Sequence, residues 1–414
     1  MKRLFVILLG ALTVFVTCQA QDYGDLEALS RICDSLDMQV PFIDDSPAEK
    51  YLKAGQNYGM TIGIALTPGG RIWNCVVGGG DNAKAYFVMN WSDDGGRTWT
   101  DNKYVIDPHD ESHPLKRRTL VGNLWTDPRG RLWLFYDQGM TYFDGCSSNW
   151  CSVCENPDAE HPVWSTPRYI GFGCSLQRPV VMSTGEWVLP VSLWDREYCD
   201  KNREKEWVHS PLREAHHDLD SLRGPHCFVS EDEGMTWEDR GFLPPLPTSN
   251  FDEQQYVELP DGRWWMTART RRCGIMQSFS SDRGRTWSPI VEWQHHINSR
   301  HNLLRLASGR LLLIRHGLVD QRTKGRSHLY AFLSDDDGQT WKGGLLLDER
   351  NGVAYPCAVQ TADGRILVSY DYCRSTQGEI YMAEFTEDEV LSGVSIGTGV
   401  GLGHLIYKAG LLCK

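Results

Sequence analysis

The chain has 414 residues and a formal net charge of -12, with 42 Lys and Arg against 54 Asp and Glu. This acidic balance excludes nucleic acid and anionic membrane surfaces as expected partners, since both require a basic face. The longest apolar run, Leu4 to Val16, is too short to span a bilayer comfortably, so we expect no membrane insertion.

The first residues are typical of an export signal. Lys2 and Arg3 precede the apolar run, and a short polar segment follows it at residues 17–21. We therefore expect residues 1–20 to be a signal peptide and the mature protein to be exported, either periplasmic or extracellular. Cys18 leaves a lipoprotein anchor as an alternative, although Val16 and Thr17 before it are not the small residues that such processing prefers.

An N-terminal extension, residues 21–56, is expected next, with helical periodicity from Leu26 to Leu36. The remainder, residues 57–414, contains little helical pattern except at Thr386 to Leu391. A long insert from about Trp194 to Pro225 is rich in charge and His, and we expect it to overhang one face as a loop.

Twelve cysteines follow the signal, from Cys33 to Cys413, and an exported chain could oxidise some of them. Their pairing cannot be deduced from the sequence. Cys146, Cys151 and Cys154 suggest a zinc cluster, but no His stands at finger-like spacing, which favours a disulfide or free buried thiols. We expect no metal and no other cofactor.

One eight-residue pattern, Ser-x-Asp-x-Gly-x-Thr-Trp, occurs four times, beginning at Ser92, Ser230, Ser280 and Ser334. Its chemistry is that of a tight hairpin, because the Asp side chain can accept from backbone amides, Gly supplies positive φ and Trp packs beneath. We therefore interpret these aspartates as structural. A degenerate fifth copy is expected around residues 156–165.

A second repeat places Gly and a polar residue before an apolar strand, and it occurs six times. The six glycines are Gly70, Gly130, Gly185, Gly262, Gly309 and Gly364. Spacings of roughly 50 to 75 residues suit one four-stranded blade each. The sequence therefore predicts an all-β chain in which residues 57–414 form one six-bladed β-propeller with Asp-box turns.

Three further stretches, together with these turns, resemble the sialidase (neuraminidase) superfamily over most of the ring. They are residues 253–269, residues 326–333, which run into the last Asp box, and residues 354–371, which contain Ala354-Tyr355-Pro356. A propeller alone says little about function, so this resemblance carries the functional hypothesis.

The resemblance assigns a role to each of five residues. It implies that Tyr355 is a nucleophile, Glu253 its base, and Arg269 and Arg326 two members of the arginine triad that grips the carboxylate of sialic acid. It implies that Asp81, just before the third strand of the first blade, is the general acid/base, with Asp107 and Asp110 as competitors. The roles are chemically consistent, because a neutral Tyr can attack an anomeric carbon that bears a repelling carboxylate, and Arg forks match carboxylate geometry.

The first triad arginine is missing, because Ile62 stands where the resemblance implies Arg. Losing one charged hydrogen bond would cost on the order of 1.5 to 3 kcal/mol in carboxylate recognition. Either the chain takes a different acidic or deoxy sugar, or another arginine substitutes. The candidates for this replacement are Arg117, Arg118, Arg178 and Arg271.

The residue pairs His216–His217 and His295–His296 have no carboxylate at ligand spacing, so we expect surface or substrate-rim positions rather than a metal site.

The resulting hypothesis is an exported, retaining exo-glycoside hydrolase that removes a terminal sialic acid or related acidic sugar from glycans. The alternatives are a catalytically silent carbohydrate-binding propeller, and a glycosidase or lyase acting on a different terminal sugar. The partner is a glycan or oligosaccharide in each case, and the oligomeric state is left open.

Overall fold

The computed structural model describes residue 31 and residues 35–110, 116–140, 147–194, 217–246 and 252–411. The expected signal peptide, most of the expected helix at residues 26–36 and most of the insert after Trp194 lie outside these residues. Short helical segments flank the ring: η1 (Glu49–Tyr51), η2 (Lys53–Gly55), η4 (His217–Leu222) and α4 (Glu387–Ser392). Helix α4 confirms the expected helical stretch, and Thr386 and Glu389 form its capping box.

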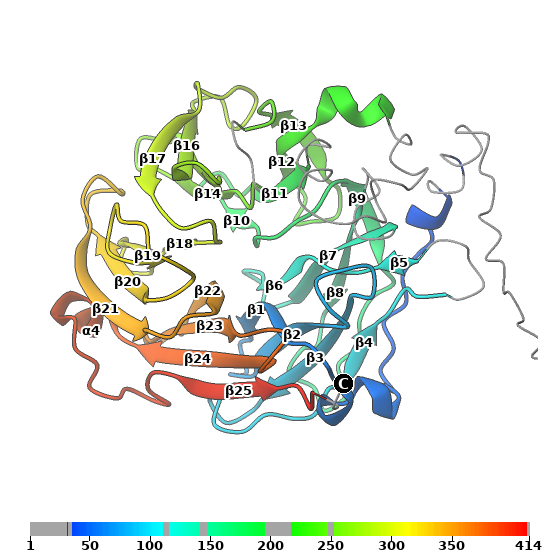
Figure 1. The fold of residues 1–414 in the computed structure, drawn as a ribbon. Coiled ribbons are helices and arrows are strands. Elements are labelled where there is room, and N and C mark those ends of the chain that lie inside the picture. Colours follow the sequence, from blue (N-terminus) through cyan, green and yellow to red (C-terminus); the bar gives the residue numbers. More distant parts are fainter. Residues whose placement is uncertain are drawn as a thin grey trace, which may run out of the picture.

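Six antiparallel sheets surround a common centre, and each is built from consecutive strands with the first strand innermost (Figure 1). Blade 1 has β1 (Met60–Leu66), β2 (Ile72–Gly78), β3 (Tyr86–Ser92) and β4 (Tyr104–Ile106); blade 2 has β6 (Gly122–Thr126), β7 (Leu132–Met140), β8 (Ser148–Cys154) and β9 (Arg168–Phe172), with β5 (Arg117–Arg118) added beside β7; blade 3 has β10 (Val180–Val181), β11 (Trp187–Leu193), β12 (Gly224–Ser230) and β13 (Glu238–Phe242). Blade 4 has β14 (Gln255–Glu258), β15 (Trp264–Arg269), β16 (Gly274–Ser280) and β17 (Val291–His295); blade 5 has β18 (Asn302–Arg305), β19 (Leu311–His316), β20 (Leu329–Ser334) and β21 (Lys342–Asp348); blade 6 has β22 (Val353–Gln360), β23 (Ile366–Tyr372), β24 (Glu379–Phe385) and β25 (His404–Lys408). The predicted six-bladed, all-β architecture is confirmed.

The Asp-box turns connect the third and fourth strands of blades 1, 3, 4 and 5. In each copy the Ser hydroxyl accepts from the Gly amide, and the Asp carboxylate accepts from the Thr amide and hydroxyl. The hydrogen bonds from Thr98 hold the pKa of Asp94 at about 2, so the carboxylate stays ionised. The structural interpretation of these aspartates is confirmed, and Asn156 occupies the corresponding turn of blade 2, where it accepts from the Val163 amide at 3.0 Å.

The Asp-box glycines also join neighbouring blades. A Cβ on Gly338 of blade 5 would lie 2.6 Å from the Trp265 ring of blade 4, and one on Gly234 of blade 3 would lie 2.8 Å from the Trp133 ring of blade 2. Each motif glycine therefore provides both a positive φ and room for the preceding blade.

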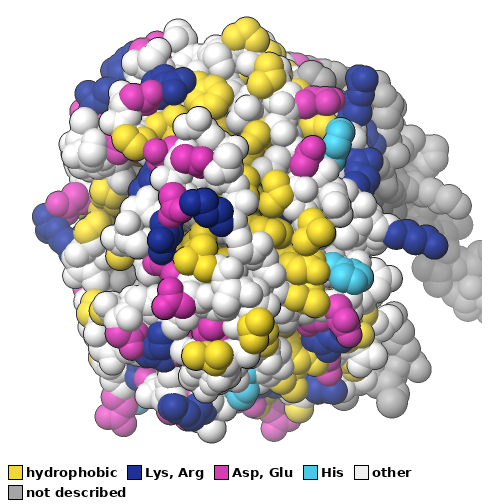
Figure 2. Space-filling view, turned by 90° about the vertical axis from the view of Figure 1, so that its left-hand side faces the viewer, with side chains coloured by type: hydrophobic (Ala, Val, Ile, Leu, Met, Phe, Trp, Pro, Cys, Tyr) yellow, Lys and Arg dark blue, Asp and Glu magenta, His cyan; other side chains and the backbone are white. Residues whose placement is uncertain are grey.

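The ring closes where the N-terminal segment meets the C-terminal one. The amide of Gly410 donates to the carbonyl of Lys53 at 2.8 Å. The amide of Leu411 donates to the carbonyl of Gln56, also at 2.8 Å. Among the described residues, no helix has the length and apolar character needed to cross a bilayer. On the side view, acidic and basic side chains are interspersed (Figure 2), in keeping with ion pairs such as that of Arg310 with Asp335.

We predict that Asp282→Ala lowers the free energy of unfolding by about 1–3 kcal/mol, because it leaves the Thr286 amide and hydroxyl without their acceptor. Denaturant unfolding measures this. The exposed Glu160→Ala variant is the control, and an Asp282→Ala variant as stable as that control would contradict the structural role.

Candidate functional site

The nominated residues meet at one end of the ring because the blades are antiparallel. The end of each second strand lies beside the start of the first and of the third. Glu253 stands two residues before β14, Arg269 ends β15 and Tyr355 lies near the start of β22. Arg326 precedes β20, and Asp81 lies between β2 and β3, so the topology carries both to the same end.

The Tyr355 ring lies among guanidinium groups. Its centroid is 3.9 Å from Cζ of Arg374, 4.4 Å from Cζ of Arg300 and 5.6 Å from Cζ of Arg326. Arg300 also donates to the backbone carbonyl of Tyr355 at 3.2 Å. Three cationic groups therefore surround the Tyr355 ring.

Glu253 and Arg269 form a buried ion pair. Nη1 of Arg269 donates to Oε1 of Glu253 at 2.8 Å, with side-chain exposures of 3% and 0%. Burial opposes the charge on Arg269, but Glu253 and then Tyr355 outweigh it and raise the arginine's pKa. The second oxygen of Glu253 is buried and has no hydrogen-bond partner among the described residues, so it is available to a ligand or to a proton.

Arg326 is held less firmly. Its Nη2 donates to the backbone carbonyl of Asn298 at 3.2 Å. Burial, followed by repulsion from Arg269 and Arg374, lowers the pKa of Arg326 to about 10. An anion placed among these guanidiniums would relieve that repulsion.

Arg374 was not foreseen as a site residue, and it is the arginine nearest to the Tyr355 ring. Its Nε donates to the buried Asp371 carboxylate at 2.9 Å, whereas its Nη2 is buried without a partner among the described residues. Although burial opposes the charge, Asp371, Tyr58 and Tyr355 raise the pKa of Arg374. Burial raises the pKa of Asp371, although the positive charge of Arg374 acts to lower it.

Asp81 belongs to the same neighbourhood. Burial raises the pKa of Tyr58, Arg374 lowers it, and Asp81, Asp371 and Tyr355 raise it further, so these charges surround one phenol. The competitor Asp107 is engaged elsewhere, because it accepts from Tyr51 at 2.6 Å and pairs with His109. His109 in turn bonds the carbonyl of Ala83 at 2.9 Å, which anchors the loop that carries Asp81.

Backbone strain concentrates at these residues. Glu253 and Tyr355 have φ of 46° and 56°, and Asp252, His328 and Cys373, beside the site residues, are also at positive φ. Such conformations are uncommon outside glycine and persist only when the surroundings impose them. The ring therefore maintains side-chain directions here that a relaxed strand would not give.

Behind the arginines lies a layer of three buried histidines. The ring centroids of His296 and His316 are 5.6 Å apart, and those of His296 and His301 are 6.4 Å apart. Burial, followed by neighbouring positive charge, lowers the pKa of His301 to about 3. Burial and nearby arginines, against a hydrogen bond to Ser327, lower that of His316 to about 3. The expected surface or rim position is wrong for His296, which is fully buried, whereas His295 is exposed as expected.

Three of the four arginines proposed as substitutes for the missing one are held by other contacts, and the fourth is exposed. Arg118 pairs with Asp137, Arg117 donates to the carbonyls of Pro108 and Leu36, and Arg178 donates to that of Ala358. Arg271 is exposed in the β15–β16 turn. Position could have indicated the residues found instead: Arg300 precedes β18 by two residues, as Glu253 precedes β14, and Arg374 follows β23 closely, where Arg269 ends β15.

No group of three or more metal-ligating side chains is found in the described part of the chain. Cys151 and Cys154 are buried free thiols, and Cys146 lies outside the described residues. Of the two expectations for these cysteines, a disulfide or free buried thiols, the structure shows free buried thiols for Cys151 and Cys154.

The family model described as a BNR repeat-like domain matches residues 73–368. The chain belongs to this family. No curated protein sequence matches it significantly. The predicted six-bladed propeller with BNR (Asp-box) repeats is confirmed by this match and by the ring itself.

Three solved structures illustrate the similarity of this BNR propeller to known folds. A leech intramolecular trans-sialidase complexed with 2,7-anhydro-Neu5Ac is 13% identical, with TM-score 0.60, covering 84% of this chain and 71% of the other. An intramolecular trans-sialidase from Ruminococcus gnavus in complex with oseltamivir carboxylate is 14% identical, with TM-score 0.58 and coverages of 84% and 98%. A Dyadobacter fermentans protein of unknown function is 16% identical, with TM-score 0.55 and coverages of 78% and 92%. At these identities the likeness establishes the fold alone.

We predict that His316 makes the fold of this BNR propeller sensitive to acid. Its folded-state pKa of about 3 lies below the ordinary value of 6.5, so the unfolded chain binds the proton first as the pH falls. Stability is fully present above about pH 6.5 and is lost toward pH 3, with about 2 kcal/mol lost from this residue between pH 7 and pH 5.

Urea unfolding of the wild type and of His316→Asn at both pH values measures the effect. The loss between pH 7 and pH 5 should be smaller in the variant by about that amount. The exposed His295→Asn variant is the control, and an unchanged loss in His316→Asn would contradict the assignment.

Proposed function

We propose that this protein is an exported, retaining exo-glycosidase that removes a terminal sialic acid or a closely related acidic sugar from glycans. The main support is the excess of positive charge around Tyr355: four guanidiniums, those of Arg269, Arg300, Arg326 and Arg374, face two buried carboxylates, Glu253 and Asp371. Before Asp81 is counted, this leaves an excess of two positive charges. A sugar carboxylate would offset the excess through charge-assisted hydrogen bonds.

In the proposed reaction, the Tyr355 hydroxyl attacks the anomeric carbon while Glu253 accepts its proton. The glycosidic bond breaks, and Asp81 protonates the departing oxygen. Water then attacks the tyrosyl-linked sugar with Asp81 as base, which releases the sugar with retained configuration. The unpartnered oxygen of Glu253 suits a proton acceptor, and the ion pair with Arg269 orients that carboxylate.

Arg374 takes the place of the triad arginine that is missing from the first strand, where Ile62 stands instead. Asp371 holds one edge of its guanidinium, and the buried, unpartnered Nη2 leaves a donor for the sugar carboxylate. Arg269, Arg326 and Arg374 then form the clamp, in which Arg269 also keeps its hydrogen bonds to Glu253 and Asn298. Arg300 donates to the carbonyls of Leu176 and Tyr355, and its buried Nε has no partner among the described residues. This arrangement restores three arginines, one of them from blade 6.

The purified mature chain is expected to release 4-methylumbelliferone from its α-sialoside, and Tyr355→Phe is expected to lower kcat by at least about 10³-fold. Fluorimetric rates measure both, with circular dichroism to establish that the variant is folded. Binding of the sialoside without turnover by the wild type would instead support the silent carbohydrate-binding propeller, and neither binding nor turnover would direct the search to other terminal sugars.

Arg374→Met is expected to lower kcat/KM for the sialoside by about 10- to 150-fold, the equivalent of one charged hydrogen bond of 1.5 to 3 kcal/mol. The kcat/KM of Arg374→Lys, which keeps the charge without the fork, should lie between those of the wild type and Arg374→Met. The methyl ester of the same sialoside is the control substrate, since it lacks the carboxylate charge. An equal loss on the acid and on the ester would contradict recognition through Arg374.

A further inference from the structure

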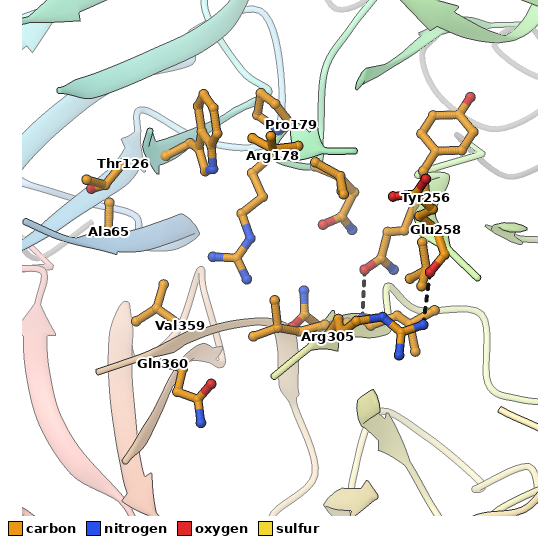
Figure 3. Close-up of a pocket in the computed structure, with 18 of the residues that line it drawn as sticks. Ala65, Thr126, Arg178, Pro179, Tyr256, Glu258, Arg305, Val359 and Gln360 are labelled. Atoms are coloured by element: carbon orange, nitrogen blue, oxygen red, sulfur yellow. Dashed lines mark hydrogen bonds between the residues drawn. The ribbon is translucent and has the colours of Figure 1, made fainter. Parts of the chain in front are cut away.

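A cavity of about 430 Å³ lies between the inner strands of all six blades (Figure 3). Its walls run along these strands, from Gln255 and Asn302 at the start of β14 and β18 to Glu258 and Arg305 at their ends. The residues assigned to the Tyr355 site are not among those that line this cavity.

Arg178 extends its guanidinium into this cavity (Figure 3). One of its nitrogens donates to the backbone carbonyl of Ala358. Within the described part of the chain, no carboxylate lies within ion-pairing distance of Arg178. Burial lowers the pKa of Arg178, and the only opposing influence is the nearby Cys357 thiol.

The other charged groups of the lining are already satisfied. The Glu258 carboxylate accepts from the amide of Ser183 at 2.6 Å and from its hydroxyl at 2.7 Å. Arg305 pairs with Asp337 at 2.8 Å and also donates to the carbonyl of Glu258. Glu258 keeps its negative charge, because its Ser183 donors are neutral, but in the described part of the chain neither Glu258 nor Arg305 forms an ion pair with Arg178.

A second donor adjoins Arg178. Gln177 lines the same cavity with only 7% of its surface exposed, and its buried Nε2 has no acceptor among the described residues. A guanidinium fork beside an amide donor is a combination that matches the oxygens of an anion. A buried charge without a partner is costly, so an occupant of opposite charge would stabilise the ring.

We propose that this axial cavity binds a small oxyanion of phosphate or sulfate size, held by Arg178 and Gln177. The site is independent of the proposed glycosidase function. The bound anion would neutralise the guanidinium of Arg178, which among the described residues has no ion pair and lies outside the Tyr355 cluster.

Calorimetric titration of the purified protein with sodium phosphate, and separately with sodium sulfate, tests the proposal at constant ionic strength. The wild type should bind one anion at this site, and Arg178→Met should weaken that binding by about tenfold or more. Gln177→Glu is the second variant, because it keeps the size of the side chain and places a carboxylate beside Arg178. It should likewise weaken anion binding by about tenfold or more, and it keeps the test decisive if Arg178→Met does not fold.

Two matched variants locate the anion. Arg326→Met removes a guanidinium at the Tyr355 end, and Arg305→Met removes one that lines the same cavity but is paired with Asp337. Both should retain the binding. Absence of binding by the wild type, retention in Arg178→Met, or loss confined to Arg326→Met or Arg305→Met would each overturn the proposal.

Discussion

The common direction of the six inner strands is the constraint on which both ends of the molecule depend. Because every blade begins at the axis and turns back antiparallel, the first residues of β14, β18 and β22 converge with the ends of β15 and β23 at one end. The same inner strands enclose the axial cavity along their length. Closure through hydrogen bonds between the two terminal segments fixes this convergence.

Charge is concentrated at the Tyr355 end at a cost that the fold must offset. Burial, followed by repulsion from Arg269 and Arg374, lowers the pKa of Arg326, and buried polar atoms such as Oε2 of Glu253 lack partners among the described residues. Positive φ at Glu253 and Tyr355 adds backbone strain. Interblade packing of the Asp-box glycines, two of them against a tryptophan of the neighbouring blade, is part of what offsets these costs.

The repeats made the fold predictable, whereas the site was predictable only in part. Six Gly-led strands and four Asp boxes specify blade number and turn position locally, and the resemblance placed Glu253, Arg269, Arg326, Tyr355 and Asp81 at one end of the ring. Arg374 escaped because it lies in no motif, and its proximity to Tyr355 arises from ring closure and from the bulge in β22 between Ala354 and Cys357. The burial of His296 was not predicted either, because a polar pair beside a strand gives no sign of which residue faces inward.

The neutral histidines explain how so many arginines can share one end of the ring. His316 accepts from the Ser299 hydroxyl at 3.2 Å and donates to the carbonyl of Ser327 at 3.1 Å, while His301 bonds the Thr267 hydroxyl at 2.9 Å. These contacts support the strands that carry the arginines without adding charge. Lysines in their place would intensify the repulsion, and carboxylates would consume the positive excess that is available to an anionic ligand. Burial is the main cause of the lowered histidine pKa values, and the neighbouring arginines lower them further, so the histidines add no charge to the cationic site.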